Sequence, residues 1–262
     1  MNFKVSILAS GSSGNAIYLA NDNIKLLIDA GLSGKKIKEG LHKIGVDGHK
    51  LDAILVTHEH KDHIQGVGVL SRQYDLPIYA NELTWTAMEH KLGKIKEENY
   101  NIFDGDFTLG NLEIQPFSIP HDASDPVGYV IYGDKTKIGI ATDMGYIPNK
   151  VKDILKETDL LVIEANHDME MLMSGPYPWM LKNRIKGELG HLSNDTVANI
   201  LPELINGNFS KILLAHLSKN NNMPKLAYET IKGVLENNGL YVGKDIQLDL
   251  TYQDKPTNIY EV

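Results

Sequence analysis

The stretch THEHKDH (57–63) directly follows the apolar run LDAILV (51–56), which is typical of a buried strand. Within these seven residues the chain places three histidines and two acids. His58 and His60 are two positions apart in a segment that we expect to be extended, so their side chains point to the same side. One histidine at a strand end would be an ordinary polar surface residue, but this concentration predicts a metal site.

The rest of the motif marks the turn from this strand into a helix. Asp62 and His63 are adjacent at that turn, so their side chains can reach toward a second ion. Glu59 and Lys61 alternate away from these candidate ligands, and we expect them to be solvated. The motif therefore offers ligands to two ions.

Three other predicted strands are also followed by a residue that can bind a metal. They are LEIQPFSI (112–119), TKIGIAT (136–142) and KILLA (211–215), and the residues are His121, Asp143 and His216. Taken singly, each has an ordinary explanation as a turn, cap or surface residue. Because open sheets gather binding sites at the carboxyl ends of their strands, we expect these residues to converge on the first motif. The candidate ligands are His58, His60, Asp62, His63, His121, Asp143 and His216.

Imidazole and carboxylate ligands suit zinc, manganese or iron. A catalytic zinc usually takes three protein ligands and a water, so this larger set suits two divalent ions about 3.5–4 Å apart. Such ions lower the pKa of a bound water from about 15.7 to about 7, which makes hydroxide available near neutrality. The pattern predicts metal-assisted hydrolysis, which needs no organic cofactor.

Composition sets wider limits. The 262 residues are 42% hydrophobic and show no linker, so we expect one globular unit spanning residues 1–262. The net charge of −8 argues only weakly against a nucleic-acid partner, because two divalent ions would add positive charge at the site itself. The chain has no cysteine and no apolar run near the ~18 residues of a membrane span. We therefore expect a cytoplasmic protein that does not contact membranes.

The remaining pattern predicts a mixed α/β fold with two sheets and helices outside them. We expect strands over residues 3–9, 16–20, 24–29, 51–56, 77–80, 112–119, 128–133, 136–142, 159–165, 211–215 and 245–250. We expect helices over 33–44, 63–74, 81–92, 148–157, 178–187, 194–205 and 224–237.

THEHKDH matches the HxHxDH signature of the metallo-β-lactamase superfamily, and His121, Asp143 and His216 follow in the order of that superfamily's remaining ligands. The resemblance spans almost the whole chain. It implies a four-layer αββα sandwich with the site at one edge, between two β-sheets. It also implies that His58, His60 and His121 hold one ion, that Asp62, His63 and His216 hold the other, and that Asp143 bridges them.

Further motifs resemble the YycJ/WalJ-type bacterial proteins of this superfamily. They are SILASGSSGNA (6–16), EANHD (164–168), YPWMLKNRIKGELGHLSN (177–194) and LLAHLSKNNN (213–222). The resemblance implies a 5′-to-3′ DNA exonuclease linked to mismatch repair, with DNA as substrate and a repair protein as a partner.

Two segments offer residues that could act on a phosphodiester. His191, in GELGHLSN (187–194), is a candidate proton donor or phosphate ligand, so we assign catalysis to His191 and Asp62. The alternative is that His191 merely lies near a helix N-cap, which Ser193 or Asn194 would provide. Ser193 is also a candidate substrate contact. The backbone N–H groups of the turn SGSSGN (10–15) could bind an anion, and the side chains of Ser12, Ser13 and Asn15 could add hydrogen bonds. The alternative interpretation is a tight turn between two strands that its glycines permit.

The segment from Tyr177 to Lys186 combines aromatic and basic residues, as grooves for single-stranded DNA do. We expect Lys182 and Arg184 to contact DNA, whereas Trp179 is better explained by packing inward. Glu164 is a candidate to orient a ligand through a hydrogen bond.

Three rival functions remain open at this point. The same metals would serve a hydrolase of a small phosphodiester, such as a cyclic nucleotide or a sugar phosphate. The superfamily resemblance also covers hydrolysis of thioesters, lactones and lactams. A non-catalytic binding module is the third. The sequence does not identify the metal or the oligomeric state.

Overall fold

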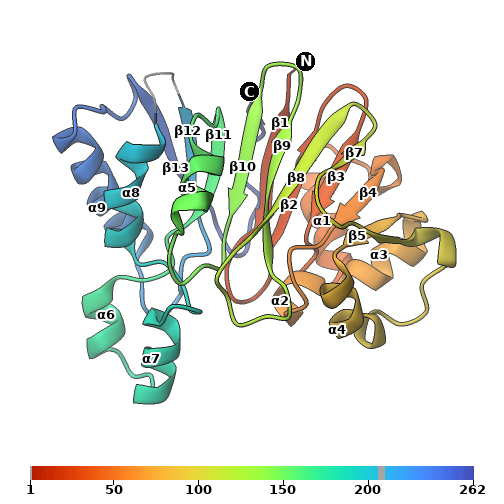
Figure 1. Cartoon of the computed structure of the whole chain (residues 1–262), viewed down its shortest axis with the longest axis horizontal. Helices are drawn as coiled ribbons and strands as arrows, with labels where there is room; N and C mark the ends of the chain where they lie inside the picture. The colour runs from red at the N-terminus through yellow and green to blue at the C-terminus, as the bar shows by residue number, and fades with distance from the viewer. Residues whose placement is uncertain (1, 206–209) are drawn as a thin grey trace.

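A computed structural model describes residues 2–205 and 210–262. Two seven-stranded sheets pack face to face, and helices cover their outer faces (Figure 1). The four-layer αββα sandwich is therefore confirmed.

The first sheet has the strand order β14-β1-β2-β3-β4-β5-β6. Its pairs are antiparallel from β14 to β3 and parallel from β3 to β6. The strands are β1 (Lys4–Ala9), β2 (Ala16–Ala20), β3 (Lys25–Ile28), β4 (Ala53–Leu55), β5 (Ile78–Ala80), β6 (Tyr100–Ile102) and β14 (Tyr260–Glu261).

The second sheet has the order β13-β12-β11-β10-β9-β8-β7 and repeats this division. Its pairs are antiparallel from β7 to β10 and parallel from β10 to β13. The strands are β7 (Phe107–Leu109), β8 (Leu112–Ser118), β9 (Val127–Tyr132), β10 (Lys137–Ala141), β11 (Leu160–Glu164), β12 (Ser210–Ala215) and β13 (Ile246–Leu250).

Helices form the outer layers and one projection. The first sheet is covered by α1 (Gly34–Lys43), α3 (Val67–Tyr74) and α4 (Glu82–Leu92), and the second by α5 (Asn149–Leu155), α8 (Asn194–Leu204) and α9 (Pro224–Asn237) (Figure 1). Short α2 (Lys61–Ile64) follows β4, and α6 (Met169–Ser174) and α7 (Trp179–Lys186) lie below the second sheet in this view (Figure 1). Two 3-10 helices span Gly48–Lys50 and Glu97–Asn99.

Local sequence explains why these elements form. All five residues of the central parallel strand β11, LLVIE, are buried, as expected for a strand covered on both faces. Ser33 Oγ accepts a hydrogen bond from Lys36 N at 3.4 Å and caps α1, and Asn81 Oδ1 accepts one from Thr84 N at 2.9 Å and caps α4. Each cap satisfies a backbone N–H that the helix leaves without a partner.

The helix expected over 63–74 is two helices instead. Gly66 separates α2 from α3, and its N–H donates to Ala30 O at 2.7 Å. A Cβ on Gly66 would lie 2.4 Å from Leu32 O, so only glycine permits this close approach. The break ties the turn after β4 to the segment that follows β3.

Four short elements, β6, β7, β14 and α6, were not expected from the sequence. The three strands have two or three residues each, too few for a recognisable apolar alternation. Among the residues that the structure describes, no helix is long and apolar enough to cross a membrane.

Candidate metal centre

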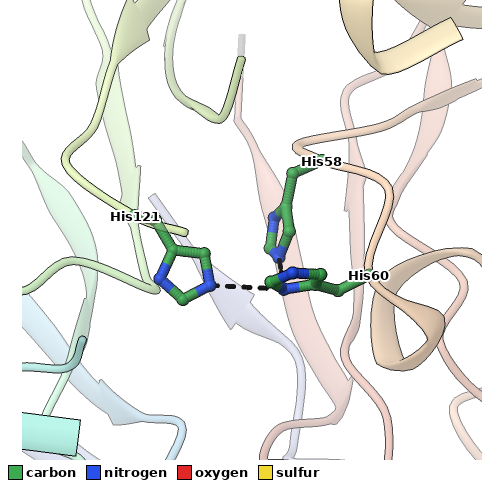
Figure 2. A group of neighbouring side chains, drawn as sticks. All are labelled: His58, His60 and His121. Carbon is green, nitrogen blue, oxygen red and sulfur yellow. Dashed lines mark hydrogen bonds between the residues drawn. The ribbon is translucent and has the colours of Figure 1, made fainter. Parts of the chain in front are cut away.

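Three imidazoles converge where β4 and β8 end. His60 Nδ1 lies 3.1 Å from His58 Nε2 and 3.3 Å from His121 Nε2, so the three rings point at one another (Figure 2). His58 is fully buried and His121 nearly so. The structure thus brings together the three side chains that the sequence assigned to one ion.

The outer ring nitrogens fix which atoms face inward. His121 Nδ1 donates to Gly190 O at 3.3 Å. His58 Nδ1 lies 3.0 Å from Thr57 Oγ1, whose own hydrogen is donated to Asp29 Oδ2. Both Nε2 atoms therefore carry lone pairs toward His60, which has one hydrogen at most to share between them at Nδ1. Convergent lone pairs without enough hydrogens suit a cation.

A second cluster adjoins the first. Asp143 Oδ2 lies 3.4 Å from His63 Nε2, and Asp143 Oδ1 lies 3.1 Å from His216 Nδ1. Asp62 Oδ2 is 3.8 Å from His63 Nε2, and the ring centroids of His63 and His216 are 6.4 Å apart. Asp143 and His58 can share one ion site with His63, which places Asp143 between the two clusters.

Asp29 is a site residue that the sequence analysis missed. It follows β3 directly, is buried, and its Oδ2 accepts hydrogen bonds from His63 Nδ1 at 2.7 Å and Thr57 Oγ1 at 2.8 Å. A carboxylate that orients a metal-binding histidine is a common feature of metal sites. An acid at the end of a predicted strand was the signal that identified Asp143, but Asp29 was counted as part of the strand over 24–29.

Glu164, at the end of β11, orients two histidines as expected. Its Oε1 accepts from His191 Nδ1 at 2.7 Å and from His216 Nδ1 at 2.8 Å, and its Oε2 accepts from Met144 N at 3.0 Å. Burial opposes ionisation, but His191 and His216 outweigh it and hold the pKa of Glu164 at about 2. His191 thus shares a carboxylate with a candidate ligand.

The donor set fits divalent ions. Among residues 2–205 and 210–262, Asp143 Oδ2 and His216 Nε2 are buried atoms without a hydrogen-bond partner. A metal ion would supply the missing partner to both. The sequence predicted such ligands at strand ends, and the orphaned atoms lie on two of them.

The raised pKa values of two histidines also indicate a site for cations. Burial opposes protonation of His63 and His216, but Asp29 and Asp143 raise the pKa of His63 to about 10, and Asp143 and Glu164 raise that of His216 to about 9. The carboxylates that hold these protons would equally attract a cation. Binding must then displace the protons, so metal affinity should rise with pH.

The clusters open into a cavity of about 250 Å³. Its walls are formed by Ser12, His60, Asp62, His121, Asp143, Asn166, Tyr177, Leu181, Arg184, Ile185, His191, His216 and Ser218. Among the predicted substrate contacts, Ser12, Arg184 and His191 line this cavity. Arg184 Nε also donates to Asp122 Oδ2 at 2.6 Å.

The other predicted substrate contacts do not line this cavity. Asn15 Nδ2 is 3.0 Å from His63 Nε2, and Ser13 Oγ donates to Gln253 Oε1 at 3.3 Å. Ser193 Oγ accepts from Thr196 N and caps α8. Lys182 is buried, and its Nζ donates to Met173 O at 2.7 Å. Their side chains thus meet other protein groups in this structure.

Two expectations about burial were wrong. Trp179 is 61% exposed rather than packed inward, because it begins α7 on the projecting segment, where Lys186 Nζ lies 5.0 Å from its ring centroid. Glu59 is buried rather than solvated, because its Oε1 accepts from Ser124 N at 2.9 Å and Ser124 Oγ at 2.8 Å. That contact ties the motif to the loop that carries His121.

The sequence pattern of the Beta-lactamase superfamily domain matches residues 25–216, a range that holds all seven candidate ligands. The chain belongs to the metallo-β-lactamase superfamily. It is 43% identical over 264 residues to "Exodeoxyribonuclease YycJ" of Bacillus anthracis, with 100% of both chains covered. It is 46% identical over 266 residues to "Exodeoxyribonuclease WalJ" of Streptococcus pneumoniae, covering 100% of this chain and 99% of that protein.

A solved structure shares the superfamily fold. The metallo-β-lactamase fold protein YhfI from Bacillus subtilis aligns with a TM-score of 0.74 and 17% identity, over 100% of both chains. At that identity the likeness concerns the fold alone. It agrees with the four layers described above.

His167, just beyond the site, gives this superfamily member a testable pH dependence. The ring is 1% exposed, and neither nitrogen has a hydrogen-bond partner within the described part of the chain. Burial lowers the pKa of His167 from 6.5 to about 4, against the opposing charge of Glu164. Below 6.5 the unfolded chain therefore binds a proton that the folded chain rejects, so stability falls as the pH drops from 6.5 to 4.

We expect His167 to make the free energy of unfolding about 2 kcal/mol smaller at about pH 5 than at about pH 8. The variant His167→Leu should not show this part of the loss of stability at low pH. Urea unfolding of both metal-free proteins at the two pH values measures it, and metal is left out because its binding also depends on pH. The same loss of stability in both proteins would contradict the assignment.

Proposed function

We propose that this chain is a two-metal 5′-to-3′ DNA exonuclease linked to mismatch repair. It is a metal-dependent hydrolase of phosphodiester bonds. The proposal rests on one observation above all: the two adjoining clusters of histidine and carboxylate ligands in a chain that matches exodeoxyribonucleases along its whole length.

We assign His58, His60 and His121 to one ion, and Asp62, His63 and His216 to the other, with Asp143 between them. When bound, zinc or manganese ions would activate a water molecule and neutralise the charge of the phosphate. The chain's own residues do the rest of the positioning. Asp29 and Glu164 hold their histidines in fixed orientations through the hydrogen bonds described above.

His191 is our candidate for the proton that the departing oxygen needs. Its Nδ1 is held by Glu164 Oε1 at 2.7 Å, which leaves the other ring nitrogen available to the cavity that His191 lines. The buried carboxylate of Glu164 behind the ring fixes the orientation of the imidazole that would donate the proton. Arg184, at 56% side-chain exposure, brings a positive charge to the same cavity for a phosphate.

A cytoplasmic location and a repair-protein partner remain predictions from the sequence. A pull-down from extract with the purified protein as bait, with and without DNA damage, would test the partner. Recovery of mismatch-repair proteins is expected, and their absence would remove that part of the proposal.

The activity itself is tested with single-stranded DNA carrying a label at either end. We expect metal-loaded protein to release labelled mononucleotides at once from the 5′-labelled strand and late from the 3′-labelled strand. The variant Asp62→Ala serves as the inactive control. Prior loss of the 3′ label would reverse the polarity, and hydrolysis confined to RNA or to a small phosphodiester would overturn the assignment to DNA.

A further inference from the structure

Two further hollows lie in a row with the metal cavity. The first, of about 540 Å³, shares Ser218 with the metal cavity and is lined by Ser13, whose neighbour Ser12 lines that cavity. The second, of about 400 Å³, shares Tyr252 and Pro256 with the first. Together the three form a track that is several times the size of the metal cavity alone.

The middle hollow is basic compared with the rest of the chain. Lys36 and Lys43 of α1 and Lys219, beyond β12, are exposed along it, and the acids Glu39 and Asp254 also line it. Lysines outnumber acids here, whereas the whole chain has 34 acids and 26 basic residues. A hollow of this charge beside a phosphodiester site suits a phosphate backbone.

Aromatic side chains follow the lysines along the track. Tyr252 stands between the two hollows with 36% of its surface exposed, and Lys255 Nζ lies 4.0 Å from its ring centroid. Tyr228 and Tyr260 line the outer hollow. Aromatic faces that alternate with positive charge are how proteins hold single strands without reading their sequence.

We propose that this track binds the single strand of nucleic acid that leads into the metal cavity. The lysines hold its phosphates, and a base stacks on the face of Tyr252 opposite the one that Lys255 covers. The inference rests on the proposed nuclease function and deepens it, because hollows that adjoin one another along the surface fit a polymer rather than one small phosphodiester. Splayed bases fit these walls, whereas a paired duplex would keep its bases stacked on one another.

Strand length gives the first test. For the metal-loaded wild-type protein, we expect kcat/KM to rise as a single strand lengthens beyond a dinucleotide and to level off once the track is filled. Rates that are already maximal for a dinucleotide would show that the track takes no part.

Variants give the second test. The triple variant Lys36→Gln/Lys43→Gln/Lys219→Gln should bind single-stranded DNA at least about tenfold more weakly, and its slope of log affinity against log salt should shrink by about 2. Lys150→Gln, on α5 and outside the track, is the matched control. Tyr252→Ala should bind about 5- to 150-fold more weakly, and Tyr252→Phe should keep affinity because the ring remains.

Metal content and thermal unfolding of every variant are measured alongside, so that a misfolded protein is recognised. Wild-type protein that neither binds nor cleaves DNA would defeat the proposed function. Wild-type protein that cleaves DNA, with track variants that bind like Lys150→Gln, would overturn this inference alone.

Discussion

Replacing His191 with alanine should lower the turnover of a DNA substrate by about 10²- to 10⁴-fold while the protein keeps both metal ions. His191 lines the metal cavity with an 18% exposed side chain, and its Nδ1 is held by Glu164 at 2.7 Å. A residue placed in this way can protonate the departing oxygen without being needed to hold the ions. The expected factor of about 10² to 10⁴ is the contribution that general acid catalysis typically makes to a rate.

Turnover measured at saturating DNA, together with metal content, separates this role from others. His90→Ala, on the exposed surface of α4, is the matched histidine control and should behave as wild type. Full turnover in a metal-loaded His191→Ala protein would remove the residue from the mechanism. Loss of a metal ion would make His191 a ligand instead, since it lies within ligand distance of Asp143, Glu164 and His216.

The second large effect is expected at Asp143. We expect Asp143→Asn to weaken metal binding by more than the roughly 10- to 100-fold that is typical for a residue that only orients a ligand. Asp143 is buried and lies 3.4 Å from His63 and 3.1 Å from His216. It can also share an ion site with His58 of the first cluster, so it can serve both clusters. Metal content after dialysis against a chelator of known affinity measures the effect.

The substitution should also destabilise the metal-free protein. Protonated His63 and His216 would lose a buried counter-charge, and removal of one partner from a buried ion pair costs about 3–5 kcal/mol. Asp143 has a φ of +62°, a conformation that asparagine also tolerates, so the backbone should remain in place. Asp75→Asn, at an exposed aspartate with a φ of +56°, is the control for that conformation. Unchanged metal affinity in Asp143→Asn would remove Asp143 as a ligand.

The sequence predicted the layers and the convergence of ligands because both follow from strand patterns. LDAILV, LEIQPFSI, TKIGIAT and KILLA all contain strands of the structure, and the residues that follow them meet at one edge. Long apolar runs are informative about a sheet, and a sheet edge then brings distant residues together. The convergence of the candidate ligands could thus be predicted without any knowledge of the loops.

What the sequence did not predict depends on contacts between loops. Asp29, Asp143 and His216 all have positive φ values within two residues of the end of a strand, a strained conformation that the surrounding packing maintains. Lys182 was expected at the substrate, but its Nζ donates to Met173 O on the projecting segment. The sequence shows the charge of a side chain, but it does not show which carbonyl group accepts its hydrogen bond.

The track of lysines and tyrosines was missed for a related reason. Lys36 and Lys43 come from α1, Lys219 from a loop and Tyr252 from beyond β13, so nothing in the local sequence joins them. Only the packing of the first helix beside the last loops creates the hollow.

Anomalous diffraction from a crystal grown with excess zinc or manganese tests the central claim most directly. We expect two peaks, one among His58, His60 and His121 and the other among Asp62, His63 and His216, with Asp143 between them. A single peak, or none at these side chains, would contradict the two-metal account.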